Sequence, residues 1–141
     1  MKTRIALILF VVILAGVAVF ALRNFKKSAI MEVLSEGLIV SAPKTNDIAT
    51  SPLTVSGYVN GGNWFGFEGQ VGSVRLIDDA GNLLAQKPLT ATTEWTTTTV
   101  WFETVLEFAK PATPTGELIF SNENPSGMPE RDKQFILPVR F

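Results

Sequence analysis

After residue 37 the sequence alternates between short apolar segments and turn-forming residues. Within several of these segments every second side chain is apolar, as from Leu53 to Val59, which is the period of a β-strand with one buried face. The intervening stretches are rich in Gly, Pro, Asp and Asn, which favour turns. The pattern predicts an all-β domain with strands at 38–40, 53–59, 70–77, 83–92, within 96–110, at 116–121 and at 134–141.

About seven short strands with no long helix among them favour an antiparallel β-sandwich of immunoglobulin-like type. The fifth expected strand indicates how such a sandwich would pack. Its residues Phe102, Leu106 and Phe108 fall on one face, while Glu103 and Glu107 fall on the other. We therefore expect the three apolar side chains in the core and the two carboxylates in water.

A separate feature precedes this domain, an apolar run from Ile5 to Leu22 without a charged residue. As an α-helix these 18 residues would rise about 27 Å, close to the hydrocarbon thickness of a bilayer. The run is longer than the roughly 7 to 15 apolar residues of a signal-peptide core, so an uncleaved anchor is preferred over a cleaved signal. We expect a signal anchor or transmembrane segment at residues 1–27, a spacer at 28–37 and the sandwich at 38–141.

Charge differs sharply between the two parts. Residues 1–27 hold five of the 12 basic residues and no acidic one, which leaves seven basic against 13 acidic residues in the remainder. The basic flanks of the apolar run suit anionic lipid head groups. The acidic domain has no electrostatic basis for binding nucleic acid, which we exclude as a partner. Because long domains are translocated largely regardless of flanking charge, we expect the C-terminal domain outside the cytoplasm.

Residues that could carry chemistry are sparse. The chain has no cysteine and no histidine, which excludes disulfides, a thiol nucleophile, a Cys/His zinc site and an imidazole base. Asp78, Asp79 and Asn82 offer neighbouring oxygen atoms, but their spacing does not fit an EF-hand loop, and a turn is the preferred interpretation. We expect no catalytic residue, metal or cofactor, and we do not expect an enzyme.

Aromatic residues are the candidate contacts. Trp64 and Phe65 lie in the glycine-rich stretch 60–69, which predicts either aromatics folded back over the core, the preferred interpretation, or an exposed platform. Trp95 lies among the threonines of 90–99, and Trp101 lies on the outer face of the fifth expected strand. These four residues are the possible contacts for a partner protein or a glycan.

Six short strings occur in an order that is similar to one protein family. They are Ala42-Pro43, the segment from Ser51 to Gly57, Phe67-Glu68-Gly69, Asp79-Ala80-Gly81, Phe102-Glu103 and the segment from Ile136 to Val139. In this order, over Ile39 to Phe141, the chain resembles the immunoglobulin-like domain of bacterial spore germination, the second GerMN-associated domain. The resemblance implies a bacterial extracytoplasmic β-sandwich with no established catalytic residue. The chain lacks the GerMN domain and a lipobox cysteine, so that a tether would use the helix.

The combined expectation is a single-pass protein of the bacterial cell membrane whose extracytoplasmic immunoglobulin-like domain binds another envelope protein without catalysing a reaction. Germination is one setting that the resemblance implies. The alternative is a module that binds glycan or peptidoglycan through exposed aromatic side chains.

Overall fold

The computed structural model describes residues 36–141, which form a compact all-β unit. The expected transmembrane segment from Ile5 to Leu22 and most of the expected spacer lie outside the described residues. Within residues 36–141, no helix has the length and apolar character needed to cross a bilayer.

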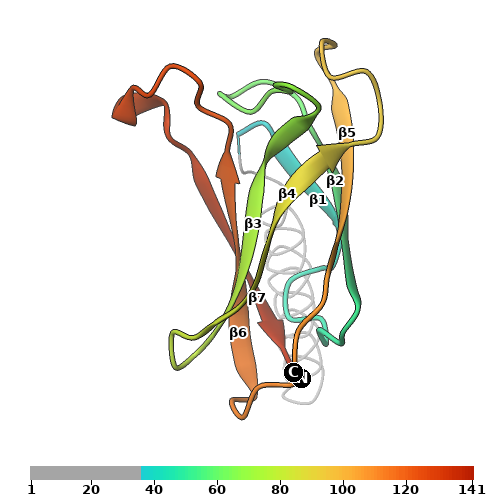
Figure 1. The fold of residues 1–141 in the computed structure, drawn as a ribbon, viewed down its shortest axis with the longest axis vertical. Coiled ribbons are helices and arrows are strands. Elements are labelled where there is room, and N and C mark those ends of the chain that lie inside the picture. Colours follow the sequence, from blue (N-terminus) through green and yellow to red (C-terminus); the bar gives the residue numbers. More distant parts are fainter. Residues whose placement is uncertain (1–35) are drawn as a thin grey trace, which may run out of the picture. The chain divides into compact units, whose positions relative to one another are not determined.

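Seven strands build this unit, which confirms the all-β expectation (Figure 1). Each expected strand is present. Apart from the fifth strand, half of the ends are as expected and the others differ by one or two residues. The largest difference is in the fifth, which occupies only the middle of the 96–110 segment. The strands are β1 (Leu38–Ala42), β2 (Leu53–Val59), β3 (Gln70–Asp78), β4 (Leu83–Ala91), β5 (Val100–Leu106), β6 (Thr115–Asn122) and β7 (Gln134–Arg140), with one 3₁₀ turn, η1 (Pro129–Arg131).

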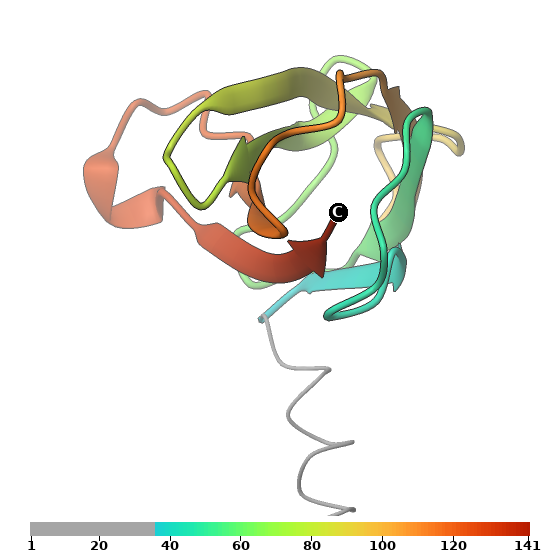
Figure 2. The ribbon, with the colours of Figure 1, turned by 90° about the horizontal axis from the view of Figure 1, so that it is seen from below.

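All neighbouring strands are antiparallel, in the order β1-β2-β5-β4-β3-β6-β7. The sheet folds over where β4 meets β5, whose pairing is short. Thr90 pairs with Glu103 and Ala91 with Phe102, and just beyond β4 the Thr92 amide donates to the Trp101 carbonyl at 2.8 Å. Three strands thereby face the other four, and Figure 2, which looks along the strands, shows them curling around one interior.

The opposite side of the sandwich is closed by residues 46–49. This segment runs parallel to the end of β7, where Ile48 forms a bridge with Arg140. The Ala49 amide donates to the Arg140 carbonyl at 2.7 Å, and the Arg140 amide donates to the Asp47 carbonyl at 2.9 Å. These bonds occupy the amide and carbonyl of Arg140 at the end of β7. Without them this edge would be open to another strand.

The core follows the alternation expected from the sequence. On β5, Phe102 and Leu106 are buried while Glu103 is exposed. Just beyond β5, Glu107 is exposed and Phe108 is partly buried against the core. Phe120 on β6 is fully buried and lies 5.9 Å from Phe135, centroid to centroid. Burying side chains of this size stabilises the fold by about 1.5–3 kcal/mol each, which a chain without disulfides requires.

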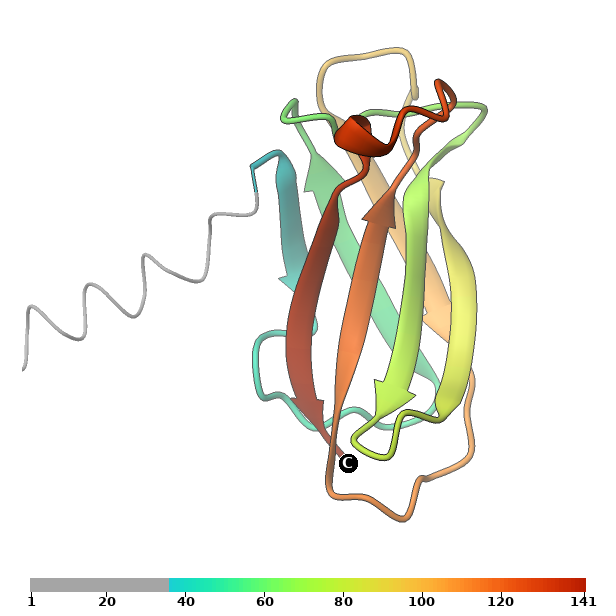
Figure 3. The ribbon, with the colours of Figure 1, turned by 90° about the vertical axis from the view of Figure 1, so that its left-hand side faces the viewer.

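Loops gather at the two ends of the sandwich. The β2–β3 loop (60–69), the β4–β5 loop (92–99) and the β6–β7 loop (123–133) lie together at one end, which we call the loop end (Figure 3). The described chain also begins there, because the Asn60 amide donates to the Gly37 carbonyl at 2.7 Å. The connections 43–52, 79–82 and 107–114 lie at the opposite end.

The expected turn at Asp78 is confirmed. The buried Asp78 carboxylate accepts hydrogen bonds from the amides of Ala80 and Asn82 at 3.0 and 2.8 Å, and from Asn82 Nδ2 at 2.9 Å. The Asn82 side-chain amide contributes most to lowering the pKa of this carboxyl, and the two backbone amides lower it further against the opposing effect of burial. The Asp78 carboxylate therefore holds the β3–β4 turn together, whereas the Asp79 carboxylate accepts a hydrogen bond from the Thr115 hydroxyl at the start of β6.

This turn should make the domain sensitive to acid. The pKa of Asp78 in the folded state lies below its ordinary value of 3.8, so the unfolded chain takes up the proton first as the pH falls. The stabilisation is complete above about pH 5 and is lost as the pH falls through the lowered pKa. The difference in unfolding free energy between wild type and Asp78→Asn, measured with urea, should shrink between about pH 5 and 3. A difference for Asp78→Asn that stays constant between about pH 5 and 3 would contradict this role.

Candidate interaction surfaces

The glycine-rich β2–β3 loop directs its two adjacent aromatic residues in opposite directions. Trp64 is only 2% exposed and belongs to the core, and its amide donates to the Gly61 carbonyl at 2.9 Å to close a tight turn. Phe65 is 42% exposed. The preferred interpretation, an aromatic folded back over the core, therefore holds for Trp64. The expectation that Trp64 contacts a partner or a glycan is wrong, because its buried indole is not accessible to a ligand.

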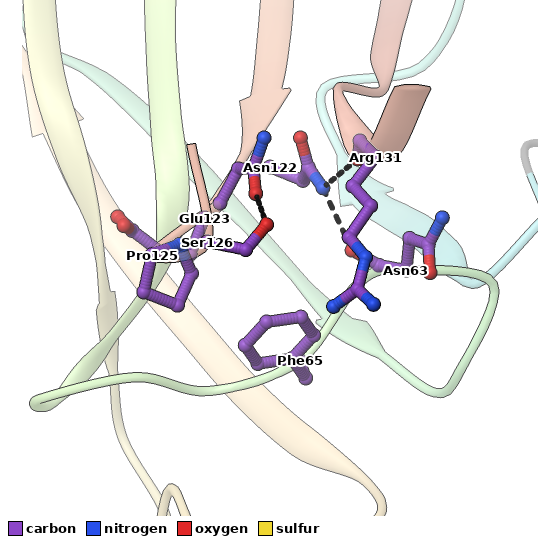
Figure 4. Close-up of a pocket in the computed structure, with 8 residues that line it drawn as sticks. Asn63, Phe65, Asn122, Glu123, Pro125, Ser126 and Arg131 are labelled. Atoms are coloured by element: carbon purple, nitrogen blue, oxygen red, sulfur yellow. Dashed lines mark hydrogen bonds between the residues drawn. The ribbon is translucent and has the colours of Figure 1, made fainter. Parts of the chain in front are cut away.

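Phe65 lines a small hollow of about 50 Å³ at the loop end (Figure 4). The Phe65 ring and the Arg131 side chain both line it. The hollow is large enough for a water molecule or the tip of a side chain but too small for a sugar ring. Its lining comes from the β2–β3 and β6–β7 loops and consists of Asn63, Phe65, Asn122, Glu123, Asn124, Pro125, Ser126 and Arg131.

Asn122, at the end of β6, joins these two loops. Its Nδ2 donates to the Asn63 carbonyl at 2.8 Å and to the Arg131 carbonyl at 3.0 Å, and its Oδ1 accepts from the Lys133 amide at 2.8 Å. Sequence reasoning did not identify this residue, because an Asn in a polar loop gives no local signal of bonds to a segment about 60 residues away. The three bonds hold the surface around Phe65 in one arrangement.

A second set of bonds shapes the β6–β7 loop itself. Asn124 Nδ2 donates to the Met128 carbonyl at 2.8 Å and to Asp132 Oδ1 at 2.7 Å. The Ser126 hydroxyl donates to Asn124 Oδ1 at 2.6 Å. With its polar groups bonded internally, the loop presents the exposed Met128 side chain from a defined position.

Trp95 extends the same surface from the β4–β5 loop. Its ring is 37% exposed and meets Phe67 edge to face at a centroid distance of 6.4 Å. The backbone also packs closely here, because a Cβ added to Gly66 would lie 2.3 Å from the Trp95 carbonyl oxygen. The structure therefore brings Trp95 to the loop end beside the β2–β3 loop, which also carries Phe65.

The loop end is acidic as well as aromatic. Its three loops contain five carboxylates and two cations, namely Glu68, Glu94, Glu123, Glu130 and Asp132 against Arg131 and Lys133. Across residues 36–141 no three acidic, His or Cys side chains are grouped so as to hold a metal ion. This charge distribution is complementary to a basic surface.

Trp101 lies elsewhere, on the outer face of the β1-β2-β5 layer. It is 47% exposed, and its ring centroid lies 4.8 Å from that of Tyr58, with the planes tilted by 46°. The strand register places Ile39 opposite Tyr58 and Tyr58 opposite Trp101, so that the three side chains form one row across the layer. We call this the Trp101 row. Its other two members were not identified from the sequence, since they follow from strand pairing.

The curled antiparallel sandwich of seven strands has the architecture of an immunoglobulin-like domain. The chain belongs to the family described as the immunoglobulin-like domain of bacterial spore germination, whose family model matches residues 38–128. This match confirms the resemblance in the sequence, although it ends before β7, whereas the resemblance was drawn to Phe141. No match was found in searches of curated proteins and of solved structures.

Proposed function

We propose that this protein is a non-catalytic, membrane-tethered module of the bacterial cell envelope whose extracytoplasmic domain binds another envelope protein through the loop end. The apolar run from Ile5 to Leu22 would supply the tether to membrane lipid. The single observation that carries the binding role is the combination of exposed Phe65, Trp95 and Met128 on hydrogen-bonded loops. Spore germination is the setting that family membership supports.

The loop end has the physical properties of a protein-binding surface. Large aromatic and Met side chains are enriched at interfaces and supply much of the binding energy. Loops already fixed by the Asn122 and Asn124 bonds lose little conformational freedom on binding. The surrounding carboxylates favour a partner with apolar pockets inside a basic rim, and they would speed encounter at low ionic strength.

Replacing the exposed aromatics should weaken the complex. We expect Phe65→Ser and Trp95→Ser each to reduce capture of the partner by about tenfold, the effect of losing a contact of roughly 1.4 kcal/mol. Capture would be measured by cross-linking envelope proteins to the full chain in cells and quantifying the products by mass spectrometry. Leu83→Ser is a matched control, because Leu83 is 57% exposed at the opposite end. An equal loss with Leu83→Ser, or none with the loop-end variants, would refute this proposal.

The Trp101 row supports a second candidate function, binding of glycan or peptidoglycan. An exposed Trp beside a Tyr offers apolar faces to a sugar ring, and the exposed Glu103 lies on the same face of β5, two residues further along. The common role of such a pair is cross-strand packing, which stabilises a sheet without a ligand.

Retention on peptidoglycan distinguishes these roles. We expect wild-type chain in nanodiscs to be retained on purified peptidoglycan if the row binds sugar. Trp101→Ala should then lower the retained fraction about tenfold, as for loss of one anchor residue. Trp95→Ala, which leaves the row intact, should bind like wild type. Absence of wild-type retention, or equal loss in both variants, would remove the glycan function.

A further inference from the structure

The outer face of β5 places a carboxylate next to an exposed aromatic pair. Trp101, Glu103 and Val105 stand at every second position of the strand and are exposed, while Phe102 between them is buried. Because side chains alternate between the two faces of a strand, the three exposed residues share the outer face. The Trp101 row therefore continues along β5 into an acidic group.

The aromatic part of this face is held in place. The Trp101 and Tyr58 rings pack across β5 and β2, which are neighbours in Figure 1, with their centroids 4.8 Å apart. The Trp101 amide donates to the Thr93 hydroxyl oxygen at 3.1 Å, and its carbonyl accepts from the Thr92 amide at 2.8 Å. The indole, which is 47% exposed, is thus presented from a fixed backbone with Tyr58 supporting one side.

The charge on this face is negative and has no cation beside it on the neighbouring strands. The strand register places Ser56 of β2 and Thr90 of β4 on the two sides of Glu103. The strands β1, β2 and β5 contain no Lys or Arg. Lys87 of β4 stands at the same alternation as buried Leu89, so that it is directed to the face opposite that of Thr90. Glu103 is therefore open to a cation from outside the domain.

An arginine side chain fits this combination of groups. Trp provides the most favourable aromatic face for a cation, and a guanidinium stacks flat on it. The same guanidinium donates paired hydrogen bonds to a carboxylate. A neutral ligand could use the ring and hydrogen bonds, whereas a planar cation uses the ring face and the negative charge of Glu103 together.

We propose that the Trp101 row and Glu103 bind an arginine side chain presented by a basic segment of another protein, with the guanidinium against the Trp101 indole and directed toward Glu103. Charge complementarity and the exposed ring carry this choice of occupant. The site shares no residue with the loop end, so that it stands whether or not the loop end binds a partner. It replaces glycan as the ligand of the Trp101 row.

Fluorine NMR of the full chain, labelled with fluorotryptophan and held in nanodiscs of neutral lipid, tests this site. The chain has three Trp residues, and single Trp→Phe variants assign their signals. The probe is the acetylated and amidated tripeptide Gly-Arg-Gly, and its citrulline analogue is a neutral control of nearly the same shape. We expect the arginine peptide to shift the Trp101 signal and the citrulline peptide to leave it unchanged. Trp64 should not respond, because it is buried.

Glu103→Gln should weaken binding of the arginine peptide by about two- to fivefold, the effect of one exposed ion pair. Glu130→Gln, which removes the same charge at the loop end, should bind like wild type, and so should Phe65→Ser. Failure here is thereby separable from failure of the loop-end proposal. A response of Trp95 in place of Trp101, equal shifts with the citrulline peptide, an unchanged affinity in Glu103→Gln, or no shift at all would overturn the inference. A Trp101 shift with chitotriose but not with the arginine peptide would overturn it in favour of the glycan function.

Discussion

Trp64→Ala is expected to lower the free energy of unfolding by about 3–5 kcal/mol, the range for removing a buried Trp or Phe side chain. Trp64 is the largest of the fully buried side chains and packs within the core from the β2–β3 loop. Because small domains are stable by only about 5–15 kcal/mol, such a loss removes a large fraction of the total stability. Denaturant unfolding followed by fluorescence of the remaining Trp residues would measure it.

The matched control is Trp95→Ala, which removes the same side chain at an exposed position of the same end. We expect Trp95→Ala to lower the free energy of unfolding by less than about 1 kcal/mol, since it leaves no cavity in the core. A loss as large as that of Trp64→Ala, or a Trp64→Ala protein as stable as wild type, would show that the two indoles are not divided between core and surface as described.

Gly57→Ala is expected to destabilise the domain by about 1–3 kcal/mol, the cost of forcing atoms into a packed interior. A Cβ at Gly57 would lie 2.1 Å from the Ile39 carbonyl oxygen and 2.9 Å from Cζ of Phe102. One of these atoms belongs to the backbone of β1, so that β1 must move away from β2. The free energy of unfolding and the hydrogen-exchange rates of the β1 amides would both report this movement.

Thr54→Ala is the control for Gly57→Ala, because Thr54 is an exposed residue of the same strand. We expect it to change the unfolding free energy by about 0.5 kcal/mol or less and to leave exchange in β1 unchanged. Slow exchange in β1 of Gly57→Ala, at wild-type stability, would contradict the close packing of β1 on Gly57.

The strands were predictable from sequence because two local signals agree. Turn residues such as Gly81 and Asn82 mark where a strand ends, and alternation places Phe102 and Leu106 on the buried face. The β2–β3 loop has no such period. Its sequence does not predict that Trp64 is buried and Phe65 exposed, because this depends on the turn in which the Trp64 amide donates to the Gly61 carbonyl.

The surfaces were less predictable than the strands, because residues far apart in sequence form them. The Trp101 row depends on the register of three strands, and one hydrogen bond joins Ser51 to Phe108 at the end opposite the loop end. Asn122 reaches Asn63 across a similar separation. The expected membrane segment from Ile5 to Leu22 lies outside the described residues and stays a prediction of the sequence.

Family membership assigns the sandwich and leaves the partner to be identified by what the exposed side chains contact. The exposed apolar residues of the two ends differ in their surroundings. At the loop end Phe65 and Trp95 are exposed on loops that carry carboxylates, whereas at the other end Ile48 and Leu83 are exposed.

Site-specific photo-cross-linking in living cells tests the role of the loop end most directly. A photoreactive phenylalanine analogue would be placed at Phe65 and, in a separate chain, at Leu83 of the opposite end; both positions are exposed. We expect a discrete cross-linked envelope protein from position 65 that is absent from position 83 and is lost on Trp95→Ser. The same product from both positions, or none from position 65, would contradict a binding surface at the loop end.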